Sequence, residues 1–199
     1  MKFIFTTHNN DKKREIEKLL KDTSFQVYSL ADVGFEDEII EDGNSFLENA
    51  KIKATTIYKK YGISTLADDS GICIDFLKGE PGIHSARYGG IGATAEEKNR
   101  LILDALKNVP YAKRGAYYVF CLYFIKDEVE SFYVEETCEG VISESPAGKG
   151  GFGYDPIFYL PEYKQSMAEI SLTEKNKISH RGKVFEAFKA RIPILFPYD

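Results

Sequence analysis

Cysteine is scarce in this chain. Its 199 residues include three cysteines, Cys73, Cys121 and Cys138, which form no CxxC motif and no Cys/His cluster. Such an odd, scattered set provides neither a disulfide framework nor a zinc signature. Because Cys73 and Cys121 lie in apolar runs, we expect them to act as small buried hydrophobic side chains.

The chain also lacks an excess of basic residues and any long apolar segment. The net charge is −5, whereas a protein that binds along a nucleic acid backbone needs an extended basic surface, so we expect no nucleic acid partner. The apolar run Phe3–Phe5 is too short for the core of a signal peptide, and no stretch approaches the length of a membrane span. We therefore predict a cytoplasmic protein without a membrane partner.

What remains is the composition of an ordinary globular protein, with 43% hydrophobic and 29% charged residues. The length suits one domain or two closely joined lobes, and no repeat, low-complexity tract or Pro/Gly/Ser linker divides it. We predict a single domain over residues 1–199.

Apolar residues follow the periods of strands and helices in mixed order. We expect strands at residues 3–7, 25–29, 63–67, 72–76, 117–125 and 129–134, the last two joined as a hairpin by a polar turn at 126–128. We expect one helix from about Asn10, one over residues 46–61 that ends at Gly62, one after a capping box of Thr94 and Glu97, and one from a Ser171–Glu174 cap towards Arg191. This mixture predicts an α/β architecture around a mixed sheet.

The first polar cluster lies between the opening strand and the first helix. It consists of Thr7, His8, Asn9, Asn10, Asp11 and Lys12. Backbone N–H groups at a helix start favour an anion, and Asn9 and Lys12 can add side-chain donors. Taken alone, the segment is better explained as an ordinary helix cap.

A second cluster, Asp68-Asp69-Ser70-Gly71, follows an apolar strand. Two adjacent carboxylates repel one another unless a cation or a donor compensates them. Mg²⁺ takes oxygen ligands and binds one or two carboxylates together with substrate phosphates. An Asp-rich hairpin turn that is closed by Gly71 explains the segment equally well.

The glycine-rich segment 148–156 contains a literal GxGxxG pattern. A dinucleotide-binding fingerprint would have to open a helix, whereas Pro156 and the apolar run after it predict a loop that enters a strand. We interpret Phe152 and Tyr154 as aromatic side chains that could sandwich a planar base, with a surface turn as the alternative.

The last cluster, residues 175–182, leads into an apolar helix face. On a helical wheel this face consists of Ile178, Phe185, Phe188 and Ile192. Arg181 falls in the middle of the face, where a charge is costly unless it is paired. We therefore expect Arg181 to contact an anion or a polar ligand atom, or alternatively an internal carboxylate. His180 projects elsewhere and by itself indicates a surface residue.

Taken together, these segments make the sequence resemble the inosine/xanthosine triphosphate pyrophosphatases of the dITP/XTP pyrophosphatase type. The matching segments follow the order of that family from one end of the chain to the other. They are Thr7-x-Asn9-x-x-Lys12, Gly43-x-Ser45-Phe46-x-Glu48-Asn49-Ala50, Ala67-Asp68-Asp69-Ser70-Gly71, Pro81-Gly82-Ile83-x-Ser85-Ala86-Arg87-Tyr88, Pro146-Ala147-Gly148 to Phe158, and Glu174-Lys175-Asn176 to Ser179-His180-Arg181-Gly182.

The resemblance implies a fold of two lobes around a long mixed β-sheet, with the active site in the cleft between them, and a homodimer. It implies Mg²⁺-dependent hydrolysis of the aberrant purine nucleotides ITP, dITP and XTP to monophosphate and pyrophosphate, which keeps them out of DNA and RNA. Asp69 would bind the metal and activate water. The phosphates would be held by Asn9, Lys12, Ser70 and Lys175, and the purine by Phe152, Gly153, Tyr154, Asp155, His180 and Arg181.

One position departs from the resemblance. Members of that family often have a metal-binding Glu three residues before Gly43, where this chain has Ile40, and we expect the adjacent Glu41 to substitute. The alternative function is a nucleotide-binding regulatory module that does not turn over its ligand. The Asp68-Asp69 pair disfavours that alternative, because a pure binder rarely needs a base there.

Overall fold

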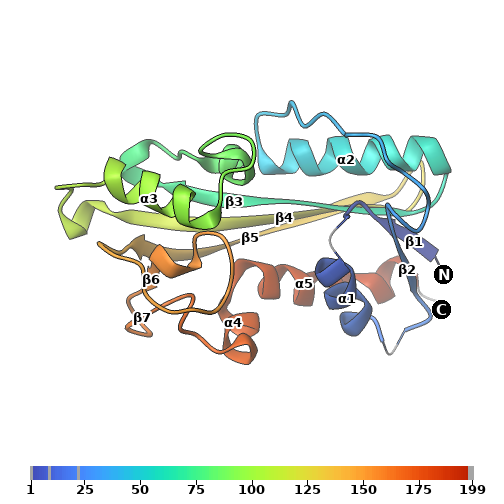
Figure 1. The fold of residues 1–199 in the computed structure, drawn as a ribbon. Coiled ribbons are helices and arrows are strands. Elements are labelled where there is room, and N and C mark those ends of the chain that lie inside the picture. The colour runs from blue at the N-terminus through green and yellow to red at the C-terminus, as the bar shows by residue number, and fades with distance from the viewer. Residues whose placement is uncertain (1, 9, 22, 197–199) are drawn as a thin grey trace. The chain divides into compact units, whose positions relative to one another are not determined.

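The computed structural model describes residues 2–8, 10–21 and 23–196 of the chain. Over these residues a seven-stranded sheet has the strand order β2-β1-β3-β4-β5-β6-β7 (Figure 1). The strands are β1 (Lys2–Phe5), β2 (Gln26–Ser29), β3 (Thr65–Ile74), β4 (Gly115–Ile125), β5 (Ser131–Ile142), β6 (Phe158–Leu160) and β7 (Gln165–Ser166). The α-helices are α1 (Asn10–Leu19), α2 (Phe46–Tyr61), α3 (Ala95–Ala105), α4 (Leu172–Ile178) and α5 (His180–Leu195). Short 3₁₀ helices are η1 (Asp75–Leu77), η2 (Gly82–Arg87), η3 (Tyr111–Lys113) and η4 (Asp155–Ile157). The predicted mixed α/β fold is confirmed.

The chain divides into two compact units. The first consists of residues 1–69, 120–136 and 183–199, and the second of residues 70–119 and 137–182. The strands β3, β4 and β5 each contribute residues to both units, so the chain crosses between the units within its longest strands.

In the first unit, the two-residue period of β1 sends successive side chains to opposite faces of the sheet. Phe3 and Phe5 pack with residues of α1 and α5, such as Phe188, in a core of large apolar side chains. Ile4 points the other way and packs with Ile57 of α2. Figure 1 accordingly shows α2 on one face of this part of the sheet, with α1 and α5 on the other. The parallel pairing of β1 with both β2 and β3 fixes this register.

The ends of α2 follow from its capping residues. Ser45 accepts a hydrogen bond from the backbone N–H of Glu48 at 3.1 Å and caps the N-terminus. Gly62 adopts the left-handed conformation, with φ 65°, and donates its N–H to the carbonyl oxygen of Tyr58 at 2.8 Å. This confirms the helix predicted to end at Gly62.

The second unit has a core of its own, in which Ile72, Tyr118 and Phe158 are buried. Its helix α3 begins with the predicted capping box. Thr94 accepts from the N–H of Glu97, and the Glu97 carboxylate accepts from the N–H of Thr94 at 2.8 Å. The strands β5, β6 and β7 pair antiparallel, which makes the sheet mixed.

The predicted turn between two short strands at residues 68–71 is wrong. β3 runs through these residues without interruption. Both aspartates can remain in a strand because they point to opposite faces, where each finds donors of its own. The hairpin that follows is confirmed, since the Lys126 N–H bonds the carbonyl oxygen of Glu130 at 2.9 Å, but its second strand starts at Ser131 rather than Val129 and extends to Ile142.

The predicted last helix is two helices. α4 ends at Ile178, Ser179 is extended with φ −70° and ψ 151°, and α5 begins at His180. The Oγ atom of Ser179 accepts from the N–H of Gly182 at 3.2 Å, as an N-cap does. Ile178 therefore does not continue the apolar face of α5.

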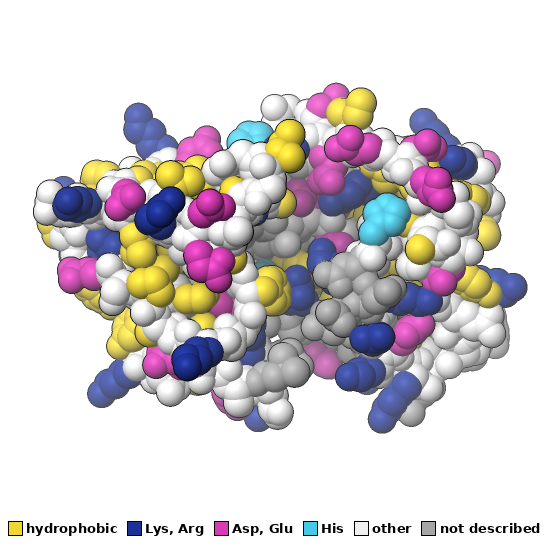
Figure 2. All heavy atoms as spheres, viewed as in Figure 1, with side chains coloured by type: hydrophobic (Ala, Val, Ile, Leu, Met, Phe, Trp, Pro, Cys, Tyr) yellow, Lys and Arg dark blue, Asp and Glu magenta, His cyan; other side chains and the backbone are white. Residues whose placement is uncertain are grey.

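Charged side chains of both signs are interspersed on the face shown in Figure 2. In the described part of the chain, no helix is long and apolar enough to cross a membrane. Cys73, Cys121 and Cys138 are buried and form no disulfide within the described residues, and the burial of Cys73 and Cys121 was expected.

Candidate active site

The two carboxylates of β3 face different helices. Along the strand, Leu66 belongs to the core on the side of α1 and α5, and Ala67 packs on the side of α2. Side chains two residues apart share a face, so Asp68 follows Leu66 and Asp69 follows Ala67. Asp68 is buried, while Asp69 and the next residue, Ser70, are half-buried.

On the first face, Asp68 meets the N-terminal part of α1. The Lys12 ammonium lies 2.5 Å from a carboxylate oxygen of Asp68, whose side chain is 4% exposed. The approach to α1 is tied to the sheet at Thr7, which is buried and accepts the N–H of Leu30 at 3.2 Å. The positive charge of Lys12 thus lies at the first turn of α1, where the backbone N–H groups of the helix also favour an anion.

The remaining members of the first predicted cluster are placed as follows. His8 is exposed, and Asn10 and Asp11 begin α1. The predicted phosphate contact Asn9 lies outside the described residues.

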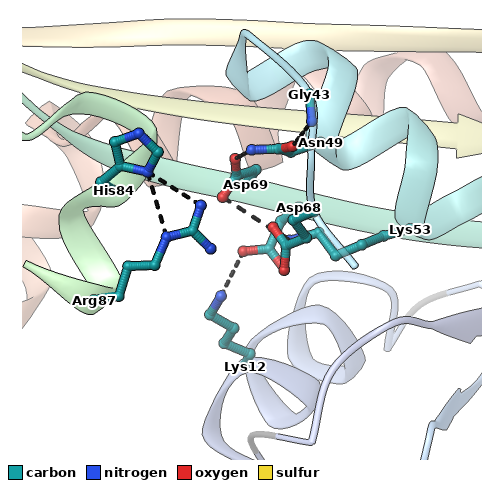
Figure 3. A network of polar contacts seen from close by, with 9 residues as sticks. Lys12, Gly43, Asn49, Lys53, Asp68, Asp69, His84 and Arg87 are labelled. Atoms are coloured by element: carbon teal, nitrogen blue, oxygen red, sulfur yellow. Dashed lines mark hydrogen bonds and ion pairs between the residues drawn. The ribbon is translucent and has the colours of Figure 1, made fainter. Parts of the chain in front are cut away.

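On the opposite face, Asp69 is held by residues of α2. Asn49 donates its side-chain N–H to an Asp69 oxygen at 3.1 Å, and the Lys53 ammonium lies 3.9 Å from the other oxygen (Figure 3). Lys53 also forms an ion pair with Glu41 at 2.9 Å. Burial lowers the pKa of Lys53, but the charges of Asp68, Asp69 and Glu41 outweigh it and raise that pKa above its ordinary value. Lys53 is therefore protonated at neutral pH.

We name Lys12, Glu41, Asn49, Lys53, Asp68 and Asp69 the carboxylate cluster. All of them belong to the first unit. Its three carboxylates face two ammonium groups, so the cluster carries excess negative charge and hard oxygen donors. These features fit Mg²⁺, which needs only one or two protein carboxylates when substrate phosphates supply further oxygens. Within the described residues, no group of three or more His, Cys, Asp or Glu side chains converges on one metal position.

The second candidate region is the glycine-rich loop of the second unit. It opens no α-helix and leads into the strand β6, as predicted, through the short 3₁₀ helix η4. Phe152 is 62% exposed, but the ring of Tyr154 is buried in the core and its hydroxyl donates to the carbonyl oxygen of Ser85 at 2.7 Å. The interpretation of two aromatic side chains that sandwich a base is therefore wrong for Tyr154, and Phe152 alone of the two presents an open ring.

Asp155 is a buried acceptor that holds this loop together. Its carboxylate accepts from the Phe152 N–H at 2.8 Å and the Tyr118 hydroxyl at 3.3 Å, and it pairs with the Lys175 ammonium at 2.5 Å. Burial, and then the nearby charge of Asp155, raise the pKa of Tyr118 well above its ordinary value, so the phenol stays a donor. The loop conformation at Phe152 thus depends on Asp155.

Cations surround the exposed Phe152 ring. The Lys175 ammonium lies 4.7 Å and the Arg181 guanidinium carbon 5.1 Å from the ring centroid. His180 is half-buried rather than projecting from the surface, because its ring stacks on Tyr118 at 4.8 Å with an interplanar angle of 16°. The break at Ser179 starts α5 at this point, which places His180 and Arg181 in its first turn.

We name Phe152, Asp155, Lys175, His180 and Arg181, together with Tyr118, the aromatic cluster. All belong to the second unit. Gly153 is linked to it through its carbonyl oxygen, which accepts from the side chain of Asn99 at 3.2 Å. Lys175, predicted to hold phosphates, thus lies in this cluster rather than in the carboxylate cluster, and its predicted role stays a prediction.

Asn49 and Lys53 were not predicted from the sequence as site residues, nor was Tyr118 as a support. The sequence does carry a signal for Asn49 and Lys53. They are polar residues four positions apart on α2, so they share a helix face with the buried Phe46 and Ala50, where apolar residues would be expected. Tyr118 gave no signal, because in sequence it is one more aromatic residue in an apolar strand.

The chain is similar to known proteins along a length that includes both clusters. The profile of the Ham1 family matches residues 3–191. The chain belongs to the Ham1 family. This Ham1 family chain is 42% identical over 189 residues to a dITP/XTP pyrophosphatase of Thermoanaerobacter pseudethanolicus, covering 95% of each chain. It is 45% identical over 186 residues to a dITP/XTP pyrophosphatase of Treponema denticola, covering 92% of this chain and 94% of the relative.

The fold agrees with solved Ham1 structures. A HAM1 protein from Coxiella burnetii superposes with a TM-score of 0.92 at 35% identity, covering 96% of this chain and 98% of the other. The family suggested by the sequence motifs is therefore confirmed.

Proposed function

We propose that the chain hydrolyses aberrant purine nucleoside triphosphates (ITP, dITP and XTP) to the monophosphate and pyrophosphate. Family membership supports this proposal, as do the dITP/XTP pyrophosphatases of other bacteria that match along almost the whole chain. The observation that carries it in the structure is the carboxylate cluster, in which Asp69 is half-buried between Asn49 and Lys53.

The carboxylate cluster suits the phosphate end of such a substrate. Lys12, at the start of α1, would meet phosphate oxygens together with the helix N–H groups. Ser70 follows Asp69 in β3 and would add a hydroxyl donor. The Lys53 ammonium lies 3.9 Å from a carboxylate oxygen of Asp69. Because it is positively charged, we propose that it also contacts the substrate phosphates.

Asp69 and Glu41 are the residues that we propose would hold Mg²⁺, since both supply oxygen ligands and both contact Lys53. When bound, the ion would neutralise charge that develops on the phosphate oxygens. Ile40 could not replace Glu41 in this role, because its side chain is apolar and is 76% exposed.

In the proposed reaction, Asp69 accepts a proton from water. The water oxygen forms a bond to the α-phosphorus, and the bond from that phosphorus to the bridging oxygen breaks, with pyrophosphate as the leaving group. Charge on the transferred phosphoryl oxygens is stabilised by Lys12 and Lys53. We propose direct attack by water, because no Ser/His/Asp or Cys/His arrangement was evident from the sequence to form a covalent intermediate.

The aromatic cluster suits the base. The exposed ring of Phe152 offers a stacking surface for a purine. Arg181 is a fixed donor that can bond the 6-oxo group of hypoxanthine or xanthine, whereas adenine presents an amino donor there. Donor facing donor in a desolvated site rejects a substrate strongly.

Pyrophosphate release tests the proposal. The wild-type chain, incubated with ITP and Mg²⁺, should release one pyrophosphate per IMP formed, and orthophosphate should not be the initial product. If the protein binds ITP but releases no pyrophosphate, the alternative of a non-catalytic nucleotide-binding module replaces the proposal.

We also propose that the protein is a homodimer, as the resemblance implies. Light scattering coupled to gel filtration should give twice the chain mass of 22.5 kDa. A mass of one chain at micromolar concentration would contradict this part of the proposal.

A further inference from the structure

Asn49 is a polar side chain enclosed within the first unit. It lies on the first turn of α2 and is 1% exposed. A buried amide of this kind is costly unless its donor and acceptor groups are both satisfied. Its partners therefore indicate why the position carries Asn.

Both groups of the Asn49 amide are used, and each has a partner of opposite type. The carbonyl oxygen accepts from the backbone N–H of Gly43 at 2.9 Å, and the amide N–H donates to an oxygen of Asp69 at 3.1 Å (Figure 3). A backbone N–H can only donate and an ionised carboxylate can only accept. One orientation of the amide therefore satisfies both, and the Asn side chain links the loop before α2 to β3.

The loop is packed closely enough to fix this link. A Cβ atom on Gly43 would lie 2.7 Å from the Cβ of Glu48 and 2.8 Å from the side-chain oxygen of Asn49. Glu48 in turn accepts the N–H of Asn44 at 2.7 Å. Gly43 is thus required by close approach, and that approach keeps the Asn49 amide at one position.

We propose that Asn49 is a positioning residue for Asp69. This inference rests on the proposed function of Asp69. By binding one carboxylate oxygen, Asn49 stops rotation of the carboxylate and leaves the other oxygen on the side of Lys53. Without the amide donor, the Asp69 carboxylate would rotate away from the orientation in which it acts.

The Asn49→Asp variant isolates this contact. Its carboxylate can still accept the N–H of Gly43, but it places an acceptor of like charge against Asp69. We expect kcat for ITP to fall about 10²-fold, the scale for a misplaced catalytic group, with KM changed by less than about threefold. Asn44→Asp is the matched control, because it adds the same charge at an exposed position of the same loop. An unchanged kcat in Asn49→Asp would overturn the proposal.

A second measurement does not depend on activity. The double variant Asn49→Asp/Asp69→Asn exchanges the two side chains and restores a donor facing an acceptor. Its Tm should recover most of the loss seen in Asn49→Asp alone, although the enzyme stays inactive. Additive losses of Tm would show that the two side chains do not interact and would overturn the proposal. Failure of the proposed function would instead appear as wild-type protein that releases no pyrophosphate, whatever the Tm values are.

Discussion

Asp68 and Asp69 are neighbours in sequence but not in their interactions. Strand geometry directs Asp68 towards Lys12 of α1 and Asp69 towards Asn49 and Lys53 of α2. Each face thus supplies a cation, which removes the repulsion that two adjacent carboxylates would otherwise feel. The half-buried Asp69, rather than the buried Asp68, is left as the carboxylate that can reach a ligand.

Glu41 is the residue through which metal dependence can be tested. We expect Glu41→Gln to raise the Mg²⁺ concentration that gives half-maximal activity, because one anionic oxygen ligand is lost. The measurement is a Mg²⁺ titration of pyrophosphate release at saturating ITP. Glu38→Gln, at an exposed position of the same segment, is the control. A titration identical to that of the wild type would make Glu41 a bystander that only pairs with Lys53.

Base preference can be tested at Arg181. The wild type should use ITP and XTP far better than ATP in kcat/KM, and Arg181→Ala should lose most of that preference. Arg191→Ala is a matched control, since its guanidinium also lies over a phenylalanine ring, at 5.4 Å from Phe132, but in the first unit. Equal use of ATP and ITP by the wild type would contradict the specificity, and an undiminished preference in Arg181→Ala would remove this residue from the role.

Asp68, Asp69, Phe152 and Arg181 could be singled out from the sequence because charged and aromatic residues interrupt apolar periodicity there, whereas Glu41 entered only through the family resemblance. The roles of Asn49 and Tyr118 could not be found in this way, because they depend on tertiary partners. Asn49 bonds Asp69, and Tyr118 bonds Asp155. The prediction that the Tyr154 ring is open to a base was wrong for a related reason. An aromatic residue beside glycine has the same sequence pattern whether its ring is exposed or, as here, bonded to a buried carbonyl.

At the scale of elements, α1 is fastened to the end of β2 by Asp32. One oxygen of this carboxylate accepts from the Lys13 ammonium at 2.6 Å and from the Ser29 N–H at 2.7 Å. The bond from Lys13, followed by those from Ser29, lowers the pKa of Asp32 to about 2 from 3.8. The start of α1, where Lys12 lies, is therefore attached to the sheet through the next residue of the helix.

This attachment predicts an acid-dependent part of stability. Because the folded pKa is below the unfolded one, the carboxylate stabilises the fold above pH 3.8, and the contribution is lost as pH falls through about 2. Asp32→Asn should lower Tm at neutral pH by roughly 1–3 °C, a modest effect because the pair is partly exposed, and it should flatten the fall of Tm in that acid range. Asp37→Asn, in the exposed pair with Lys60, is the control and should change neither. An unchanged pH profile in Asp32→Asn would contradict the assignment.

Elements were predictable where a local signal marks their ends. The capping box at Thr94 and the glycine cap at Gly62 gave correct boundaries, since each satisfies orphan backbone groups within a few residues. The strand β3 and the break at Ser179 were not predictable in this way. β3 continues through its two aspartates only because α1 and α2 supply donors to them. At Ser179, the apolar periodicity of the sequence continues without interruption, so it does not indicate that the Ser179 side chain caps a new helix.

At the scale of the whole molecule, the Ham1 profile spans both units and therefore both clusters. The proposed function assigns phosphate chemistry to the carboxylate cluster of the first unit and base recognition to the aromatic cluster of the second. Variants of the two clusters should therefore separate in kinetics. Loss at Asp69 should reduce turnover of every nucleotide, whereas loss at Arg181 should change the ranking among them.

Turnover by Asp69→Asn is the most direct test of the central claim that Asp69 activates water for pyrophosphate release. The substitution keeps the size of the side chain but removes its basicity, so kcat for ITP should fall by about 10² or more while the protein remains folded by its Tm and still binds ITP. Asp104→Asn, at an exposed position of α3, should keep wild-type kcat. Near-wild-type turnover by Asp69→Asn at saturating Mg²⁺ would contradict the account.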